Sequence, residues 1–284
     1  MKNDYTQAQA QFFDDHPPLA PWDKILTAKG LSLLFRPKDI YCKQILDGLK
    51  IKPSDKILEV GCGQGIYLKR IVTTYGVSGV GVDVSGQSIN FAKKHWADKR
   101  LKFRLADGIS LPFKQNYFDK VMSFDVLEHI KDQKQAINEM VRVLKPGGRL
   151  FIYTLNRNDK YTLDWFWYQL GFDVYAKARH RPELFIDPQL MKRQLLKLKL
   201  DSIVIQPYDA FFTLAAEELT MVMVWLLIKI GLGENQRVGR VFLRLSSWLA
   251  KGFYPLLLLL DRPWFCRGRS VGLSIVARKP VKND

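Results

Sequence analysis

Three glycines at every second position, Gly61, Gly63 and Gly65, are the residues whose spacing most clearly indicates chemistry in this 284-residue chain. They follow the apolar run 56–60 and precede residues that recur at helical spacing from Tyr67 onward. Glycine allows a backbone to turn sharply and to approach a ligand closely, and the start of a helix offers free N–H groups. The pattern therefore predicts a strand, a tight turn and a helix that bind a nucleotide-like ligand.

A carboxylate at the end of a second strand narrows the class of ligand. Asp83 ends the apolar run 79–83 and lies 18 residues after Gly65, close to the offset of about 20 residues at which an acidic side chain binds ribose hydroxyls. An adenosine-containing ligand is therefore favoured. A dinucleotide-binding motif would place its third glycine where this chain has Ile66, so a nicotinamide oxidoreductase is disfavoured.

Strands and helices are expected to alternate around this turn. Strands are predicted at 56–60, 78–83, 101–106, 118–124 and 148–154, with helices at about 65–75, 86–97 and 131–144. This alternation predicts an α/β fold, a doubly wound parallel sheet covered by helices on both faces. Ligands of such sheets bind outside the carboxyl ends of the strands, which is where Gly61, Asp83, Asp107 and Asp125 lie.

A series of motifs in this order resembles the class I S-adenosylmethionine-dependent methyltransferases, in particular the type 11-like branch that methylates small molecules and lipids. The resemblance covers about residues 40 to 206 and resumes near 269. It implies a Rossmann-like seven-stranded sheet whose last strand is antiparallel, S-adenosylmethionine as the cofactor, and N-terminal helices that fold over it. For these helices, expected at 5–13 and 22–34, an amphipathic cover on the edge of the sheet is the alternative. The motifs are Glu59–Gly65 with Asp83, Ala106–Gly108, Leu111–Phe113, Phe118–Asp119, Ser123–His129 and Leu144–Gly148.

Roles for the cofactor-binding residues follow from their chemistry and from this resemblance. The glycines let the backbone approach the cofactor, and Glu59 either holds the turn or meets the cofactor's amino group. Asp83 would accept hydrogen bonds from both ribose hydroxyls; capping of the next helix is its alternative role. By resemblance, Asp107 would bind the adenine amino group. The full set that we predict is Glu59, Gly61, Cys62, Gly63, Gly65, Asp83, Val84, Asp107, Gly108, Phe124 and Asp125.

Methyl transfer requires an aligned acceptor, and a base where the acceptor must lose a proton. His129 and His180 are the candidate catalytic bases, although His129 also belongs to a motif in which it has a structural alternative. We predict no metal ligands. The three cysteines, Cys42, Cys62 and Cys266, form neither a disulfide framework nor a zinc spacing, which favours a reducing compartment.

The net charge of +16 favours an anionic partner: nucleic acid, an acidic bilayer surface or an acidic substrate. Methyltransferases of exocyclic base amines usually carry Asn or Asp, two prolines and an aromatic residue after the fourth strand. This chain has Phe124–Leu127 there, without proline, which makes nucleic acid an unlikely partner. An RNA methyltransferase and a non-catalytic cofactor-binding or scaffold protein are the alternatives.

An insertion at 207–268 bears on the class of acceptor. Its apolar stretch leaves only Leu219–Ile228 uncharged, which is short of the ~18–20 residues of a spanning helix. Arg237, Arg240 and Arg244 share one stripe of the predicted helix 236–251, beside an apolar face, and five leucines follow at 256–260. This combination is typical of a helix lying in an anionic membrane surface, with packing between helices or a dimer interface as the alternative.

The predicted organisation therefore has four parts: an N-terminal helical cover at 1–45, a methyltransferase core at 46–206, a hydrophobic and basic helical insertion at 207–268, and a last strand and tail at 269–284. The N-terminus lacks the apolar core of a secretory signal. We expect a cytoplasmic protein, peripheral on the inner face of the membrane, with a small lipid-like acceptor. The aromatic-rich stretch Tyr161–Phe172 is the expected acceptor pocket, and no oligomeric state is indicated.

Overall fold

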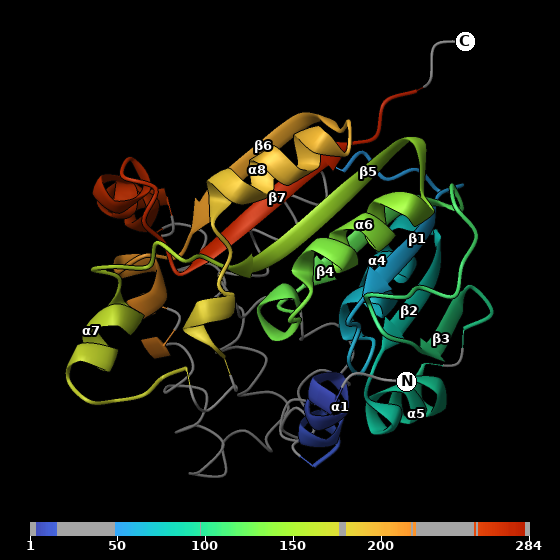
Figure 1. Cartoon of the computed structure of the whole chain (residues 1–284), viewed down its shortest axis with the longest axis horizontal. Helices are drawn as coiled ribbons and strands as arrows, with labels where there is room; N and C mark the ends of the chain where they lie inside the picture. The colour runs from blue at the N-terminus through green and yellow to red at the C-terminus, as the bar shows by residue number, and fades with distance from the viewer. Residues whose placement is uncertain are drawn as a thin grey trace.

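The computed structural model describes residues 4–15, 49–96, 98–175, 180–216, 218–219, 253 and 255–281. Figure 1 shows a twisted sheet flanked by helices, with the α1 helix (Asp4–Asp15) lying at one end of the strands beside α5 (Gly86–His95). The predicted second N-terminal helix at 22–34 and the predicted amphipathic helix 236–251 both lie outside the described residues.

Seven strands form one sheet in the order β3-β2-β1-β4-β5-β7-β6. Strands β1 to β5 are parallel, whereas β7 runs antiparallel to both β5 and β6. The predicted doubly wound fold and its antiparallel last strand are confirmed. The strands are β1 Lys56–Val60, β2 Ser78–Asp83, β3 Leu101–Leu105, β4 Phe118–Phe124, β5 Leu144–Leu155, β6 Asp201–Tyr208 and β7 Gly272–Arg278.

The described helices begin where the sequence places capping residues. Ser85 accepts a hydrogen bond from the Ser88 amide to start α5, and Asp187 accepts from two amides to start α8, with Pro188 at its first position. Gly76 ends α4 in the left-handed conformation, at φ +71°. The remaining helices are α4 Ile66–Tyr75, α6 Gln133–Val143, α7 Leu163–Gln169 and α8 Pro188–Lys197, with the 3-10 turns η1 Leu127–His129 and η3 Pro182–Leu184.

The hydrophobic core lies on both faces of the sheet because the central strands are buried on both sides. Leu58 and Val60 of β1 pack on the face covered by α6 and α8, and Ile57 packs on the opposite face with α4 and α5. Adjacent side chains of a strand point to opposite faces, so the apolar run 56–60 supplies both halves of the core. This arrangement holds the carboxyl ends of the strands in one row.

Part of the leucine run joins this core. Residues 255–265 are helical, and Leu257 and Leu258 are partly buried against the α4 and α5 face, whereas Leu256, Leu259 and Leu260 are exposed. Within the described part of the chain, no helix combines the length and the apolarity that crossing a bilayer requires.

Candidate cofactor and acceptor site

Two positions of the turn between β1 and α4 can be occupied only by glycine. Gly61 has φ +72°, and a Cβ atom there would lie 2.2 Å from Cγ2 of Val126. Gly65 precedes α4 with φ +77°, and a Cβ atom there would lie 2.4 Å from the Phe103 ring. Both the left-handed backbone and the close packing therefore require the glycines that the motif supplies.

Asp83 lies at the end of β2 and is hydrogen-bonded to the glycine turn. Its Oδ2 accepts the Gly63 amide at 2.7 Å, and its Oδ1 accepts the Ser85 amide at 2.9 Å. Burial raises the pKa of the Asp83 carboxyl above its ordinary value, and the amide donors of Ser85 and Gly63 oppose this rise. The side chain of Ser85, not that of Asp83, caps α5.

A cavity of about 240 Å³ opens at the carboxyl ends of β1, β2, β3 and β4. Eight of the residues predicted from the sequence line this cavity, together with residues for which the sequence carries no signal. The eight are Gly61, Gly63, Asp83, Val84, Asp107, Gly108, Asp125 and His129. The others include Thr6, Gln9, Phe13, Ile109, Ile130 and Lys131.

Helix α1 covers this cavity. Thr6, Gln9 and Phe13 line it, and the helix is joined to the start of α5 by Asp14. Oδ1 of Asp14 accepts hydrogen bonds from Oγ of Ser85 at 2.5 Å and from the Gln87 amide at 3.1 Å. The sequence predicts a helix at 5–13, but its contact residues carry no spacing signal because their partners lie more than 70 residues away.

Two histidines meet beside the cavity. The ring of His129 lies 5.3 Å from that of Phe13, edge to face, and 5.0 Å from that of His180. Burial and, next, the neighbouring His180 lower the pKa of His129 to about 4, so its imidazole is neutral near pH 7. The two predicted catalytic histidines therefore come together, and His129 also lines the cavity.

Residues 58–152 match a family model described as a methyltransferase domain. The chain is 35% identical over 120 residues to an O-methyltransferase of Pyrenophora dematioidea, covering 41% of this chain and 45% of that protein. It is 32% identical over 164 residues to a ubiquinone biosynthesis O-methyltransferase of Bartonella tribocorum, covering 53% of this chain and 63% of that protein. The chain thus spans less than two thirds of the length of these curated relatives.

Residues 58–152 are thus similar to a methyltransferase domain, and the comparisons support a class I S-adenosylmethionine-dependent methyltransferase domain. The fold of the chain is also that of geranyl diphosphate C-methyltransferase from Streptomyces coelicolor A3(2), solved with Mg²⁺, geranyl-S-thiolodiphosphate and S-adenosyl-L-homocysteine. The TM-score is 0.65 over 98% of this chain and 99% of the other, and at 16% identity the likeness is one of fold. S-adenosylmethionine is the cofactor of this family.

Four residues that the sequence predicted as cofactor-binding do not line the cavity. Oε2 of buried Glu59 accepts the Leu68 amide at 3.1 Å, and burial raises the pKa of this carboxyl well above its ordinary value. Glu59 therefore holds the turn, the first of its two predicted roles. The side chain of Cys62 is buried, Gly65 starts α4, and the ring of Phe124 stacks on that of Tyr67 at 4.9 Å.

The aromatic stretch 161–172 of this chain does not line the described cavity. None of the α7 residues is buried, and Phe172 is 61% exposed. These side chains pack on other surface aromatics instead: Phe166 lies 5.9 Å from Phe211, which stacks on Trp264 at 6.0 Å. The cavity walls come from α1 and from the segments that follow β1 to β4.

Proposed function

We propose that this protein transfers the methyl group of S-adenosylmethionine to a small, hydrophobic acceptor that enters the cavity beside His129. The observation that carries the proposal is the hydrogen-bonded pair of Gly63 and Asp83 in the wall of the cavity. A buried carboxylate held by two backbone amides keeps its remaining lone pairs in a defined position, as recognition of a ribose diol requires.

The remaining cavity residues have roles that fit the other parts of the cofactor. Asp107 follows β3, and its Oδ1 accepts the Ile109 amide at 3.1 Å, which orients the carboxylate we assign to the adenine amino group. Gly108 lines the same cavity, and a Cβ atom there would lie 3.2 Å from Val60, so a larger residue would crowd this wall. Gly61, Val84 and Asp125 complete the cofactor wall.

The acceptor side of the cavity is formed by His129 and Phe13 in this proposal. The cofactor's sulfonium already makes the methyl carbon electrophilic, so alignment of the acceptor supplies most of the acceleration. The neutral imidazole of His129, whose ring lies 5.0 Å from that of His180, is suited to receive a proton from an acceptor hydroxyl or amine. His129 lines the cavity, which supports this assignment.

We further propose that the acceptor is lipid-like and reaches the enzyme at an anionic membrane surface. One relative is named for ubiquinone biosynthesis, and one structural neighbour was solved with a geranyl diphosphate analogue. Exposed apolar side chains on α7 and on the helix 255–265, among them Phe166 and Leu259, support contact with a bilayer. The indole N–H of Trp264 donates to the Tyr161 carbonyl at 2.5 Å and holds these two segments together.

A labelling experiment tests both levels of the proposal. Purified protein is incubated with methyl-labelled S-adenosylmethionine and a total extract of its host's cells, followed by organic–aqueous partition. Label in the organic phase supports methyl transfer to a lipid-like acceptor, and mass spectrometry then names the product. Label in the aqueous phase that ribonuclease releases would favour an RNA acceptor, and no label despite measured cofactor binding would favour a non-catalytic module. The Asp83→Ala variant is the matched blank.

A further inference from the structure

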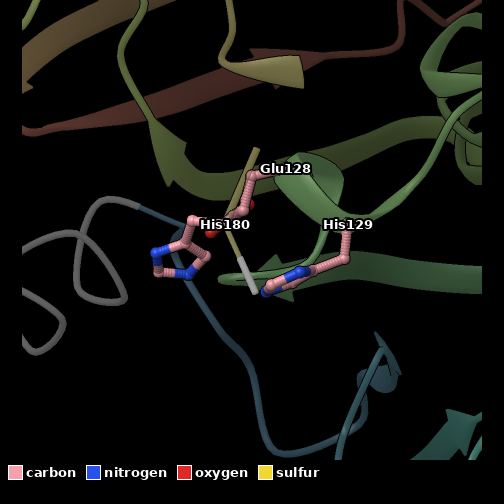
Figure 2. A group of neighbouring side chains, drawn as sticks. All are labelled: Glu128, His129 and His180. Carbon is pink, nitrogen blue, oxygen red and sulfur yellow. The ribbon is translucent and has the colours of Figure 1, made fainter. Parts of the chain in front are cut away.

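Three side chains with metal-ligating atoms converge at the wall of the cavity. Glu128, His129 and His180 each offer one ligand atom, and these atoms all lie within 4.8 Å of one another. Figure 2 shows Glu128 and His129 projecting from the η1 turn toward the ring of His180. The first two are neighbours in sequence, whereas the third comes from the segment before η3.

We propose that Glu128, His129 and His180 bind a divalent transition-metal ion of the zinc type, which positions an oxygen of the acceptor. Two imidazoles and one carboxylate are a ligand set that suits zinc and iron, and imidazole is a poor ligand for magnesium or calcium. Three protein ligands leave coordination positions open for a ligand from the cavity. Ion binding is inferred from the cluster itself, whereas positioning of the acceptor oxygen rests on the proposed methyl transfer.

The geometry fits an ion after small movements of the side chains. Ligand atoms at about 2.0–2.2 Å from a shared ion lie roughly 3–3.5 Å apart. The present limit of 4.8 Å therefore requires a closure on the order of 1 Å, which rotation of an imidazole can supply. His129 supports the assignment because its Nδ1 atom is buried and has no hydrogen-bond partner within the described residues.

The surroundings hold the three ligands as a metal site requires. Thr154 donates its hydroxyl to Oε2 of Glu128 at 2.8 Å, and both side chains are fully buried, which fixes the carboxylate. Gln133 donates to the carbonyl oxygens of Leu127 at 2.9 Å and Leu184 at 2.5 Å. This side chain joins the η1 turn to the η3 turn and so keeps the His180 segment close to His129.

With the ion bound, the two imidazoles act as ligands rather than as proton acceptors, and the ion gives the transfer step a defined nucleophile. An acceptor hydroxyl that binds the ion loses its proton to solvent more readily, because the positive charge lowers the pKa of the hydroxyl. The oxygen lone pair then forms the bond to the methyl carbon while the carbon–sulfur bond breaks. The electron pair of the breaking carbon–sulfur bond stays on sulfur, which becomes the neutral thioether of S-adenosylhomocysteine. The inference therefore names the acceptor class as an ionisable hydroxyl compound, such as a phenol.

Metal titration of the full chain tests ion binding without relying on activity. Protein freed of metal by dialysis against a chelator is titrated with Co²⁺, a spectroscopic substitute for Zn²⁺, and visible absorption is recorded. We expect one ion per chain for the wild type and at least tenfold weaker binding for His180→Ala and for Glu128→Gln, whose amide oxygen can still accept from Thr154. His95→Ala, an exposed histidine on α5, is the control and should bind as the wild type does.

Cofactor affinity and thermal unfolding of each variant separate loss of the site from loss of the fold. Equal Co²⁺ binding in wild type, His180→Ala and Glu128→Gln, or binding below one equivalent in wild type, would overturn the ion site. Full methyl transfer by chelated protein would overturn the ion's role in the reaction. Stoichiometric ion binding with no transfer to any acceptor would instead count against the proposed function alone.

Discussion

Gly63 donates its backbone N–H to Oδ2 of Asp83 at 2.7 Å, across 20 positions of the chain. This hydrogen bond joins the turn after β1 to the end of β2, so the two signals that the sequence shows separately are one structural unit. Displacement of either residue would move the other, and the ribose position that we propose depends on both.

Substitution of Asp83 tests that unit directly. Asp83→Ala should weaken S-adenosylmethionine binding roughly tenfold to a hundredfold, since hydrogen bonds to a charged group contribute about 1.5–3 kcal/mol. Isothermal titration calorimetry measures the change. Asp98→Ala, which removes an exposed ion pair with Arg100 before β3, is the control and should leave the affinity unaltered. Unchanged affinity in Asp83→Ala would refute the ribose assignment.

Acidification should weaken cofactor binding at a higher pH than an ordinary carboxyl would require. Burial raises the pKa of Asp83, and ribose hydroxyls donate to the carboxylate form. Affinity is therefore full above the raised pKa and decreases as the pH falls through it. Dissociation constants of the wild type, measured between about pH 4.5 and 7.5, should therefore rise as the pH falls. The Asp83→Asn variant should bind the cofactor weakly, with an affinity that does not change with pH. If its affinity instead falls with pH in parallel with that of the wild type, another group causes the effect.

Gly61→Ala should reduce the free energy of unfolding more than Gly76→Ala does. Both glycines have φ near +70°, so both substitutions bear the left-handed backbone cost of about 1–2 kcal/mol. Only at position 61 does the new Cβ atom also meet Val126, at 2.2 Å; at position 76 nothing lies within 4 Å. Denaturant unfolding of the two variants isolates the steric part. Equal destabilisation would show that Val126 can move aside.

Asp14→Ala should speed the release of bound cofactor. The carboxylate joins α1 to α5 through Ser85 and Gln87, and loss of about 1–2 kcal/mol of hydrogen bonding would raise the dissociation rate roughly fivefold to thirtyfold. Stopped-flow displacement measures that rate. Asp15→Ala on the same helix is the matched control, because Asp15 is exposed and, among the described residues, its side chain accepts a hydrogen bond from Gln11 of α1 alone. Identical rates in the two variants would mean that α1 does not retain the cofactor.

Replacement of Arg237, Arg240 and Arg244 by glutamate should abolish binding to anionic vesicles. These residues lie outside the described part of the chain, and the expectation comes from their stripe in the sequence. Vesicle flotation is the measurement.

A second triple variant makes this membrane test specific. Lys192, Arg193 and Lys197 are exposed basic residues of α8, and their replacement by glutamate alters the net charge by the same amount. This control should still float with vesicles. If both triple variants float, residues 236–251 are a packing or partner surface; if neither does, net charge rather than the predicted helix drives adsorption.

The sequence by itself determined the order and identity of most elements near the cofactor. Strands 56–60, 78–83 and 118–124 have the predicted bounds because their apolar runs are buried on both faces and end at glycine or acidic residues. Strand β5 begins at Leu144 rather than at 148, since Leu144 pairs with Phe118 before the register shifts. Local apolar patterning cannot reveal a pairing that spans a bulge.

Only the tertiary structure decided which residues share the cavity and which support it. Glu59 and Phe124 stand in cofactor motifs, yet one bonds the Leu68 amide and the other stacks on Tyr67. The side chains from α1 reach the cavity through contacts with no sequence spacing. His129 and His180 lie 51 positions apart, and no linear pattern predicts their approach to Glu128. Spacing encodes local turns and helix faces, whereas a site assembled from segments far apart in the sequence exists only once the sheet has brought them together.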